Sequence, residues 1–421
     1  MQTALAETFR DTEAGREADA ILRACVHCGF CTATCPTYRL LGDELDGPRG
    51  RIYLMKQVLE GGTPTARTQL HLDRCLTCRS CETTCPSGVR YGRLLDIGRE
   101  LVETSVPRRL PERLLRRLLR AVIPHRRRFT LLLRAGQSLR RVLPRSLRVQ
   151  IPPRRAAGAW PERAHARTML VLQGCVQPAL APDINAAAAR VLDRLGIRLI
   201  AANDGCCGAL SHHLTAPAEA RAFMRRNIDA WWPHIVAGAE AIVMTASGCG
   251  AHVREYGHLL RDDPAYAERA ARVSELTKDI SEVVAAAVSA VSLRASPFTP
   301  HVERVAFQSP CTLQHGQKLT GVVEALLQRA GFVLTPVADG FLCCGSAGSY
   351  SILQRELAET LRARKLETLL AGKPQVIATA NIGCLIHLQA ASPVPVRHWI
   401  ELLDESFPDG DKPWLTKTRK T

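Results

Sequence analysis

Residues 25–36 read CVHCGFCTATCP, and the same spacing returns at residues 75–86 as CLTCRSCETTCP. Both segments place four cysteines as C-x2-C-x2-C-x3-C and follow the last cysteine with proline. Three thiolates at this spacing surround one iron–sulfur cube, and the fourth reaches a second cube. We therefore expect two [4Fe–4S] clusters, the first held by Cys25, Cys28, Cys31 and Cys85, and the second held by Cys75, Cys78, Cys81 and Cys35.

Zinc is the competing interpretation, because C-x2-C pairs also form zinc ribbons. A ribbon uses four ligands in two pairs, and two complete sets of four, each followed by proline, fit it poorly. A zinc-rich regulatory or scaffold protein stays as the alternative from another class. Arg49 and Arg51, in the segment between the two motifs, are candidates for setting the electrostatics of the clusters.

The composition indicates an intracellular protein with metal or redox chemistry. The 421 residues are enough for two or three domains, and 46% of them are hydrophobic. The N-terminal segment has no apolar signal core, and the longest apolar stretch, VVAAAVSAVSL, is too short to cross a bilayer. In a cytoplasmic protein the 16 cysteines stay reduced, so their clustering indicates metal sites rather than disulfides. We expect a cytoplasmic chain, with peripheral attachment to the inner face of the membrane as an option.

The positive charge is concentrated in one segment. The net charge is +16, and residues 106–156 hold sixteen arginines and a single acid, Glu112. Within this segment RRLPERLLRRLLRAVIP predicts an amphipathic helix, whose apolar face is Leu110, Leu114, Leu115, Leu118, Leu119 and Val122. The neighbouring arginines form the predicted docking set for an anionic membrane or an acidic partner: Arg113, Arg116, Arg117 and Arg120. A helix packed on its own protein is the alternative. Nucleic acid is not expected, because the chain has no aromatic platform and no recognised binding motif.

From about residue 167 short apolar runs alternate with helical patterns, which predicts parallel α/β architecture. The pattern occurs twice. Cys175 and Cys206 are 31 residues apart, and Cys311 and Cys343 are 32 apart; Cys207 to Cys249 spans 42 residues and Cys344 to Cys384 spans 40. The predicted fold class is α+β: a mostly helical two-cluster domain, then a duplicated α/β domain with parallel sheets. The predicted boundaries are 1–105 for the cluster domain, 106–158 for the helical connector, 159–300 and 301–408 for the two repeats, and 409–421 for a tail.

Each repeat contains a cysteine, a CCG triplet and a CxxH pair, just after predicted strands. The candidate residues are Cys175, Cys206, Cys207, Cys249 and His252, then Cys311, Cys343, Cys344, Cys384 and His387. Four interpretations stay open. The cysteines alone hold a cluster while the histidine donates a hydrogen bond to sulfur; the histidine replaces one thiolate, as in Rieske centres; the cysteines are remnants of a lost site; or CCG is a redox dithiol or quinone-reducing site.

The duplicated order of Cys, CCG and CxxC resembles the cysteine-rich domain of heterodisulfide reductases, except that histidine replaces the last cysteine in both halves. Joined to a two-cluster ferredoxin domain, it resembles the iron–sulfur subunits of glycolate oxidase, anaerobic glycerol-3-phosphate dehydrogenase and heterodisulfide reductase complexes. The stretches CVHCGFCTATCPTYRLLGDELDGPRGRIYL and LHLDRCLTCRSCETTCPSGVRYG look most like glycolate oxidase iron–sulfur subunits.

The resemblance implies a chain that relays electrons while FAD-binding subunits oxidise glycolate to glyoxylate, with a quinone-type or membrane acceptor. Related alternatives are the same role with D-lactate or glycerol 3-phosphate, and a heterodisulfide-reductase-like catalytic subunit. The sequence has no nucleotide-binding glycine fingerprint and no P-loop. We therefore expect FAD only in partner subunits and no catalytic residue in this chain.

Overall fold

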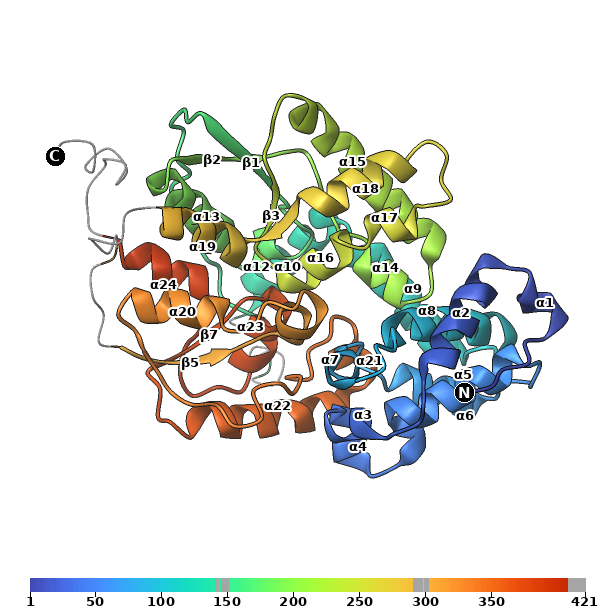
Figure 1. The fold of residues 1–421 in the computed structure, drawn as a ribbon. Coiled ribbons are helices and arrows are strands. Elements are labelled where there is room, and N and C mark those ends of the chain that lie inside the picture. The colour runs from blue at the N-terminus through green and yellow to red at the C-terminus, as the bar shows by residue number, and fades with distance from the viewer. Residues whose placement is uncertain (141, 143, 145–150, 291–297, 299–302, 408–421) are drawn as a thin grey trace.

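The computed structural model describes residues 1–421 except 141, 143, 145–150, 291–297, 299–302 and 408–421 (Figure 1). The predicted tail, 409–421, lies outside the described residues. In this part of the chain no helix is long and apolar enough to cross a membrane.

The first domain is mostly helical, as predicted. Its elements are α1 (Glu7–Arg10), α2 (Glu13–Ala24), α3 (Phe30–Ala33), α4 (Pro36–Leu41), η1 (Glu44–Asp46), α5 (Pro48–Leu59), α6 (Ala66–Asp73), α7 (Ser80–Thr84) and α8 (Tyr91–Ser105). Helices α4 and α5 both begin with proline, whose fixed φ suits the first helical position. The core forms where α2, α5 and α8 bury apolar side chains, including Leu22, Met55, Leu59, Leu94 and Leu95. This packing positions the two cysteine loops.

The first repeat contains β1 (Arg167–Val171), α12 (Gln177–Leu180), α13 (Asp183–Arg194), β2 (Ile197–Ala201), α14 (Ala209–His213), α15 (Pro217–Val236), β3 (Ile242–Met244), α16 (Ser247–Val253), α17 (Tyr256–Leu259), α18 (Ala267–Leu276), β4 (Thr277–Asp279) and α19 (Ile280–Ala290). The second contains β5 (Arg304–Gln308), η2 (Thr312–Gly316), α20 (Val322–Arg329), β6 (Val333–Leu334), α21 (Tyr350–Leu353), α22 (Arg355–Leu370), β7 (Val376–Thr379), α23 (Ile382–Gln389), β8 (Val396–His398) and α24 (Trp399–Glu405).

The two sheets have the same topology. Their strand orders are β2-β1-β3-β4 and β6-β5-β7-β8, and every pair is parallel. This confirms the predicted duplicated α/β fold with parallel sheets. The fourth strand of each sheet was not predicted from the sequence.

The two repeats pack into one body. Helix α24 of the second repeat packs on α13 of the first, and α19 of the first packs on α20 of the second (Figure 1). One buried apolar cluster draws side chains from both sheets. At the end of β8, the fully buried imidazole of His398 donates from Nε2 to the carbonyl oxygen of Thr245 in the first repeat, at 2.8 Å. The duplicated halves are therefore joined by both apolar packing and a buried hydrogen bond.

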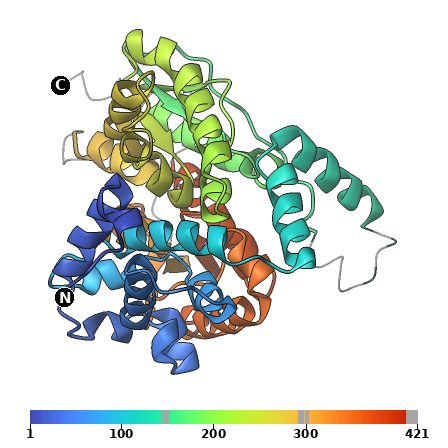
Figure 2. The same cartoon turned by 90° about the vertical axis from the view of Figure 1, so that its right-hand side faces the viewer.

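Two helices connect the cluster domain to the repeats: α9 (Leu110–Val122) and α10 (Arg126–Leu139). They are the two teal helices at the right of Figure 2. The predicted docking set needs a correction here. Arg116 is 8% exposed and faces the protein, where its guanidinium pairs with Asp73 at 3.1 Å and Glu112 at 2.9 Å. Arg120 pairs with Glu219 of α15 at 3.2 Å.

The predicted apolar face of α9 is also divided between the protein and the solvent. Leu119 is buried, because it lies on the same side of the helix as Arg116. Leu110, Leu114 and Leu118 are more than half exposed, and Arg113 and Arg117 are exposed beside them. The exposed surface of α9 is therefore an apolar stripe with two flanking cations rather than the full predicted set.

Candidate iron–sulfur centres

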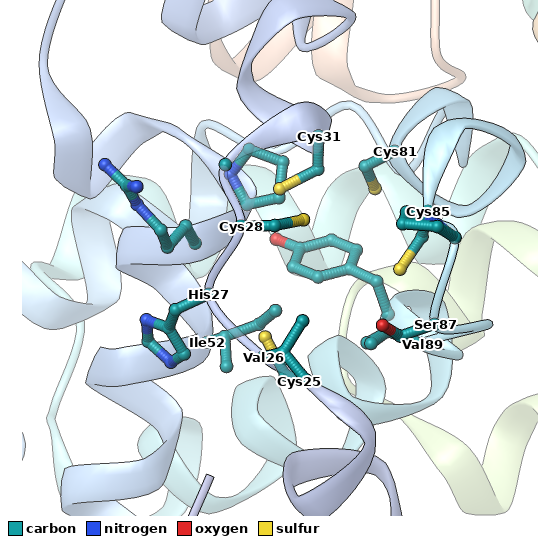
Figure 3. A pocket seen from close by; sticks show the side chains of 15 residues that line it. Cys25, Val26, His27, Cys28, Cys31, Ile52, Cys81, Cys85, Ser87 and Val89 are labelled. Carbon is teal, nitrogen blue, oxygen red and sulfur yellow. The ribbon is translucent and has the colours of Figure 1, made fainter.

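The first cysteine set surrounds a cavity that opens toward the surface. Figure 3 shows the side chains of Cys25, Cys28, Cys31 and Cys85 facing this common space. Three come from the loop between α2 and α3 and from α3 itself, and Cys85 follows α7. The structure thus brings the fourth cysteine of the second motif to the first three of the first motif. Cys28 is exposed, whereas Cys25 is buried.

The second set lines a neighbouring cavity that is more enclosed by protein. Its cysteines are Cys35, Cys75, Cys78 and Cys81. Here the last cysteine of the first motif joins the first three of the second motif. Cys81 borders both cavities, so the two sets lie side by side. Each cavity therefore brings together cysteines from both motifs.

The loops that carry these cysteines share an unusual backbone. In the first loop His27 and Gly29 have φ of 56° and 87°, and in the second Thr77 and Arg79 have φ of 54° and 59°. Positive φ on either side of the second cysteine turns the chain around a centre, and such turns direct successive N–H groups inward as anion-binding concavities. The Thr77 amide already donates to Cys75 Sγ at 3.5 Å. The loops are therefore shaped to enclose a negatively charged group.

Arg51 places a buried positive charge beside the second set. It is 1% exposed, and its Nε donates to the His71 carbonyl at 2.7 Å, while its Nη1 donates to Thr37 Oγ1 at 3.1 Å. Thr37 Oγ1 lies 3.3 Å from Cys35 Sγ. Burial lowers the pKa of Arg51, but Cys75, Tyr91 and Cys35 outweigh burial, so its pKa stays above the ordinary value and the charge is retained. Arg49 instead pairs with Glu44 near the surface at 2.6 Å.

The chemistry of the thiols fits a metal cluster. Burial, and then the charge of neighbouring cysteines, raises the pKa of Cys78 and Cys81 well above the ordinary value, and raises that of Cys31 to about 11. Crowded buried thiolates are therefore unfavourable by themselves, and a bound metal supplies the positive charge that stabilises them. Bound [4Fe–4S] clusters would accept and donate single electrons.

Each repeat also gathers its four cysteines. In the first, thiol contacts link Cys175 to Cys206, Cys206 to Cys207 and Cys207 to Cys249. The second has the same chain of contacts through Cys311, Cys343, Cys344 and Cys384, with Cys311 and Cys343 sulfurs 3.7 Å apart. Contact with Cys343, followed by burial, raises the pKa of Cys311. All eight predicted cysteines thus belong to two equivalent clusters of thiols.

The glycine of each CCG triplet is required by geometry. Gly208 and Gly345 have φ of 93° and 91°, and a Cβ would lie 3.0 Å from the Ala220 carbonyl oxygen or 2.6 Å from that of Ala358. The amide of each glycine donates to the sulfur two residues earlier at 3.4 Å, to Cys206 and Cys343 respectively. A side chain at either position would push the loop off the neighbouring helix.

The two histidines do not join the thiols. Among the described residues, no hydrogen bond links either imidazole to a cysteine sulfur. His387 donates from Nε2 to the Ala358 carbonyl at 3.3 Å, on the helix that packs against Gly345. His252 turns instead toward His212 and His213, with ring centres 5.3 and 6.3 Å away. Sequence reasoning missed this histidine group, although the pair in SHHL, residues 211–214, was a visible signal.

The comparisons with known proteins agree with this architecture. Residues 21–89 match the 4Fe–4S dicluster domain, and residues 169–254 and 305–389 each match the cysteine-rich domain. The chain is therefore an iron–sulfur electron-transfer protein that carries a dicluster domain with two [4Fe–4S] clusters, followed by a duplicated cysteine-rich domain.

Curated relatives identify its family. The chain is 56% identical to the glycolate oxidase iron-sulfur subunit of Escherichia coli (strain K12), over 97% of this chain and 99% of that one. It is 32% identical to the probable glycolate oxidase iron-sulfur subunit of Bacillus subtilis (strain 168), over 87% and 88%. Lactate utilization protein A of Bacillus licheniformis is 25% identical over 55% of this chain and 96% of its own length. The chain belongs to the glycolate oxidase iron–sulfur subunit family, and it is the non-flavin subunit of an oxidoreductase complex.

Proposed function

We propose that the chain relays electrons in a complex that oxidises glycolate to glyoxylate, with FAD in partner subunits and a quinone-type acceptor. The observation that carries this proposal is the near-full-length identity of 56% with a glycolate oxidase iron-sulfur subunit. The gathering of all sixteen cysteines into four sets supports it. Each set is the proposed ligand set of one iron–sulfur centre, two in the first domain and one in each repeat.

The exposure of the first cysteine set supports electron entry there. Cys28 is exposed, and beside it Val26 and Phe30 are 67% and 60% exposed. An apolar patch at the mouth of a redox centre suits a protein partner that must approach closely. We propose that the FAD-binding subunit docks over Cys28, Val26 and Phe30.

The second cysteine set connects to the repeats. Cys78 packs in one buried cluster with Cys311 and Cys343 of the second repeat, together with Leu76 and Tyr350. This packing supports transfer from the first domain to the second repeat, because the two cysteine sets are neighbours.

Helices α9 and α10 are the proposed attachment to a membrane. Leu110, Leu114 and Leu118 on α9, with Leu131 and Leu132 on α10, are between 52% and 68% exposed. Arginines lie around them, and the segment 106–156 has a net charge of +15. Exposed leucines flanked by arginine suit an anionic phospholipid surface. This docking would hold the complex close to a membrane quinone.

Lactate is the second candidate substrate, and the matches to proteins called lactate utilization protein A favour it.

The test is to purify the chain anaerobically with its partners and to measure reduction of a quinone analogue. Glycolate, D-lactate and glycerol 3-phosphate serve as separate donors. Glycolate should give the highest kcat/KM. A complex that oxidises D-lactate or glycerol 3-phosphate at least tenfold better would reassign the substrate.

A further inference from the structure

A further cavity lies where the dicluster domain meets the two repeats, apart from the two cavities that the ferredoxin-type cysteine sets line. It is an opening of ≈ 480 Å³ continuous with solvent. Its wall combines the second cysteine loop with α8, α14, α16, α17 and η2, and includes Cys78, Asp96, His212, His213, His252 and Leu259. Segments of the dicluster domain and of both repeats thus meet around one space.

His252 is the residue that indicates a ligand. It is 7% exposed, and its Nε2 is buried without a hydrogen-bond partner. Burial, followed by the charge of His212, holds its pKa well below the ordinary value, so the imidazole is neutral. A buried polar atom without a hydrogen-bond partner is unfavourable, because it has lost its hydrogen bonds to water. A bound group with a hydrogen-bonding oxygen would remove that cost.

The second repeat shows that this feature is not an obligatory part of the fold. His387 occupies the equivalent position, and its Nε2 is satisfied by the Ala358 carbonyl. In the first repeat the imidazole of His252 instead lines the cavity, and its Nε2 has no partner. The difference between two otherwise matching halves indicates a role specific to His252.

The charges of the cavity favour an uncharged ligand. Arg79 and Arg93 both pair with the same carboxylate, Glu255, and Asp96 is a second acid in the wall, so two acids balance the two arginines. On the other wall His212 lies 3.2 Å from Asp96. Burial would raise the pKa of Asp96, but His212 outweighs burial and holds that pKa well below its usual range. Asp96 is therefore an ionised carboxylate that holds the His212 imidazole in place.

The cavity also contacts the redox machinery, because Cys78 of the second cysteine set lies in its wall. Leu259 and Ala251 supply apolar surface beside the histidines. An uncharged carbonyl compound that takes up electrons and protons matches these properties: the apolar surface of Leu259 and Ala251, an unpartnered hydrogen-bonding imidazole, an imidazole held by a carboxylate and an adjacent electron donor.

We propose that this cavity binds the headgroup of a quinone, with His252 hydrogen-bonded to one carbonyl oxygen and the His212–Asp96 pair beside the ring. The inference rests on the proposed function and locates its acceptor site. Oxidation of the hydroxy acid to its keto acid releases two electrons and two protons. The quinone takes up two electrons and two protons and leaves as quinol, so the overall reaction balances.

The test is direct binding of 2,3-dimethoxy-5-methyl-1,4-benzoquinone to the oxidised, cluster-loaded chain, measured by equilibrium dialysis. His252→Leu removes the hydrogen-bonding group and should weaken binding at least tenfold, while His252→Gln, which keeps an amide donor, should recover most of it. His387→Gln is the matched control at the equivalent position and should bind like wild type. Retained absorbance near 400 nm shows that each variant keeps its clusters.

Two outcomes would overturn the proposal: a wild-type chain that binds no quinone, or a His252→Leu variant that binds as tightly as wild type. Either result leaves the proposed function intact if the full complex still reduces the quinone with glycolate. In the assembled complex, His252→Leu should raise the KM for quinone, while the rate with ferricyanide, a one-electron acceptor that needs no such site, stays unchanged. Failure of glycolate oxidation with both acceptors would count against the proposed function instead.

Discussion

Arg51 is the residue whose surroundings say most about the second cysteine set. The spacing of the cysteines predicts two groups of four, because a fixed spacing limits which thiols can reach one metal centre. It could not show that Arg51 is fully buried against Cys35 and Cys75, since that depends on how α5 packs. Nor could it show the unpartnered Nε2 of His252, which depends on α8 and α14 meeting α16.

Arg51→Met should lower the midpoint potential of the second cluster, because a buried positive charge that stabilises the extra electron is removed. It should also destabilise the chain by about 3–5 kcal/mol, since Arg51 forms a buried ion pair with Asp46 at 3.4 Å and its loss leaves that carboxylate partly uncompensated. Arg49→Met is the matched control, because its partly exposed pair with Glu44 is worth about 1 kcal/mol or less. Redox titration and thermal unfolding measure the two effects. Equal potentials in Arg51→Met and wild type would contradict the electrostatic role.

Helices and strands were predictable where apolar runs were long. Three of the apolar runs that follow residue 167, TMLVLQGC, RVAFQSPC and QVIATANIGC, contain β1, β5 and β7. The strands β4 and β8 were missed because each has three residues and leads directly into a helix, so neither leaves a period-two pattern to recognise. The amphipathic pattern of α9 was recognised, but the direction in which it packs was set by the pairing of Arg116 with Asp73.

The exposed apolar stripe of α9 predicts that the chain binds anionic vesicles and that this binding depends on the two exposed arginines beside the stripe. Replacing Arg113 and Arg117 with glutamine should weaken binding to phosphatidylglycerol vesicles by about 2 kcal/mol, roughly 30-fold, at about 1 kcal/mol for each charge. The effect should shrink as salt is raised, since salt screens exposed charges. Flotation of the full complex measures it, with Arg272→Gln plus Arg355→Gln as a control far from α9. Equal flotation of the α9 variant and wild type would refute membrane docking through this helix.

At the level of the whole molecule, His398 couples the two repeats and makes their union sensitive to acid. Burial lowers the pKa of His398 from 6.5 to about 4, so it is neutral in the folded chain and must charge when the chain unfolds in mild acid. A depressed histidine pKa means that the unfolded state binds more protons between pH 6.5 and 4. The part of the unfolding free energy that depends on His398 is therefore fully present above pH 6.5, and it is lost as the pH falls toward 4.

The expected loss from this residue is about 2 kcal/mol by pH 5, from the 1.36 kcal/mol that each pKa unit represents. His398→Gln keeps a donor for Thr245 but cannot titrate. Its thermal unfolding temperature should fall less than that of wild type between pH 7 and pH 5. An equal fall in unfolding temperature between pH 7 and pH 5 in the two proteins would show that His398 does not govern stability in acid.

The central claim is that the last cysteine of each motif is a ligand of the cluster held by the other motif. Electron paramagnetic resonance during an anaerobic redox titration tests this most directly, on wild type, Cys85→Ser and Cys35→Ser. Wild type should show two interacting [4Fe–4S] signals from the first domain. Cys85→Ser should alter the cluster of Cys25, Cys28 and Cys31, and Cys35→Ser the cluster of Cys75, Cys78 and Cys81, with loss of quinone reduction in both. A colourless zinc-loaded protein, or a Cys85→Ser variant that alters only the cluster of its own motif, would contradict the account.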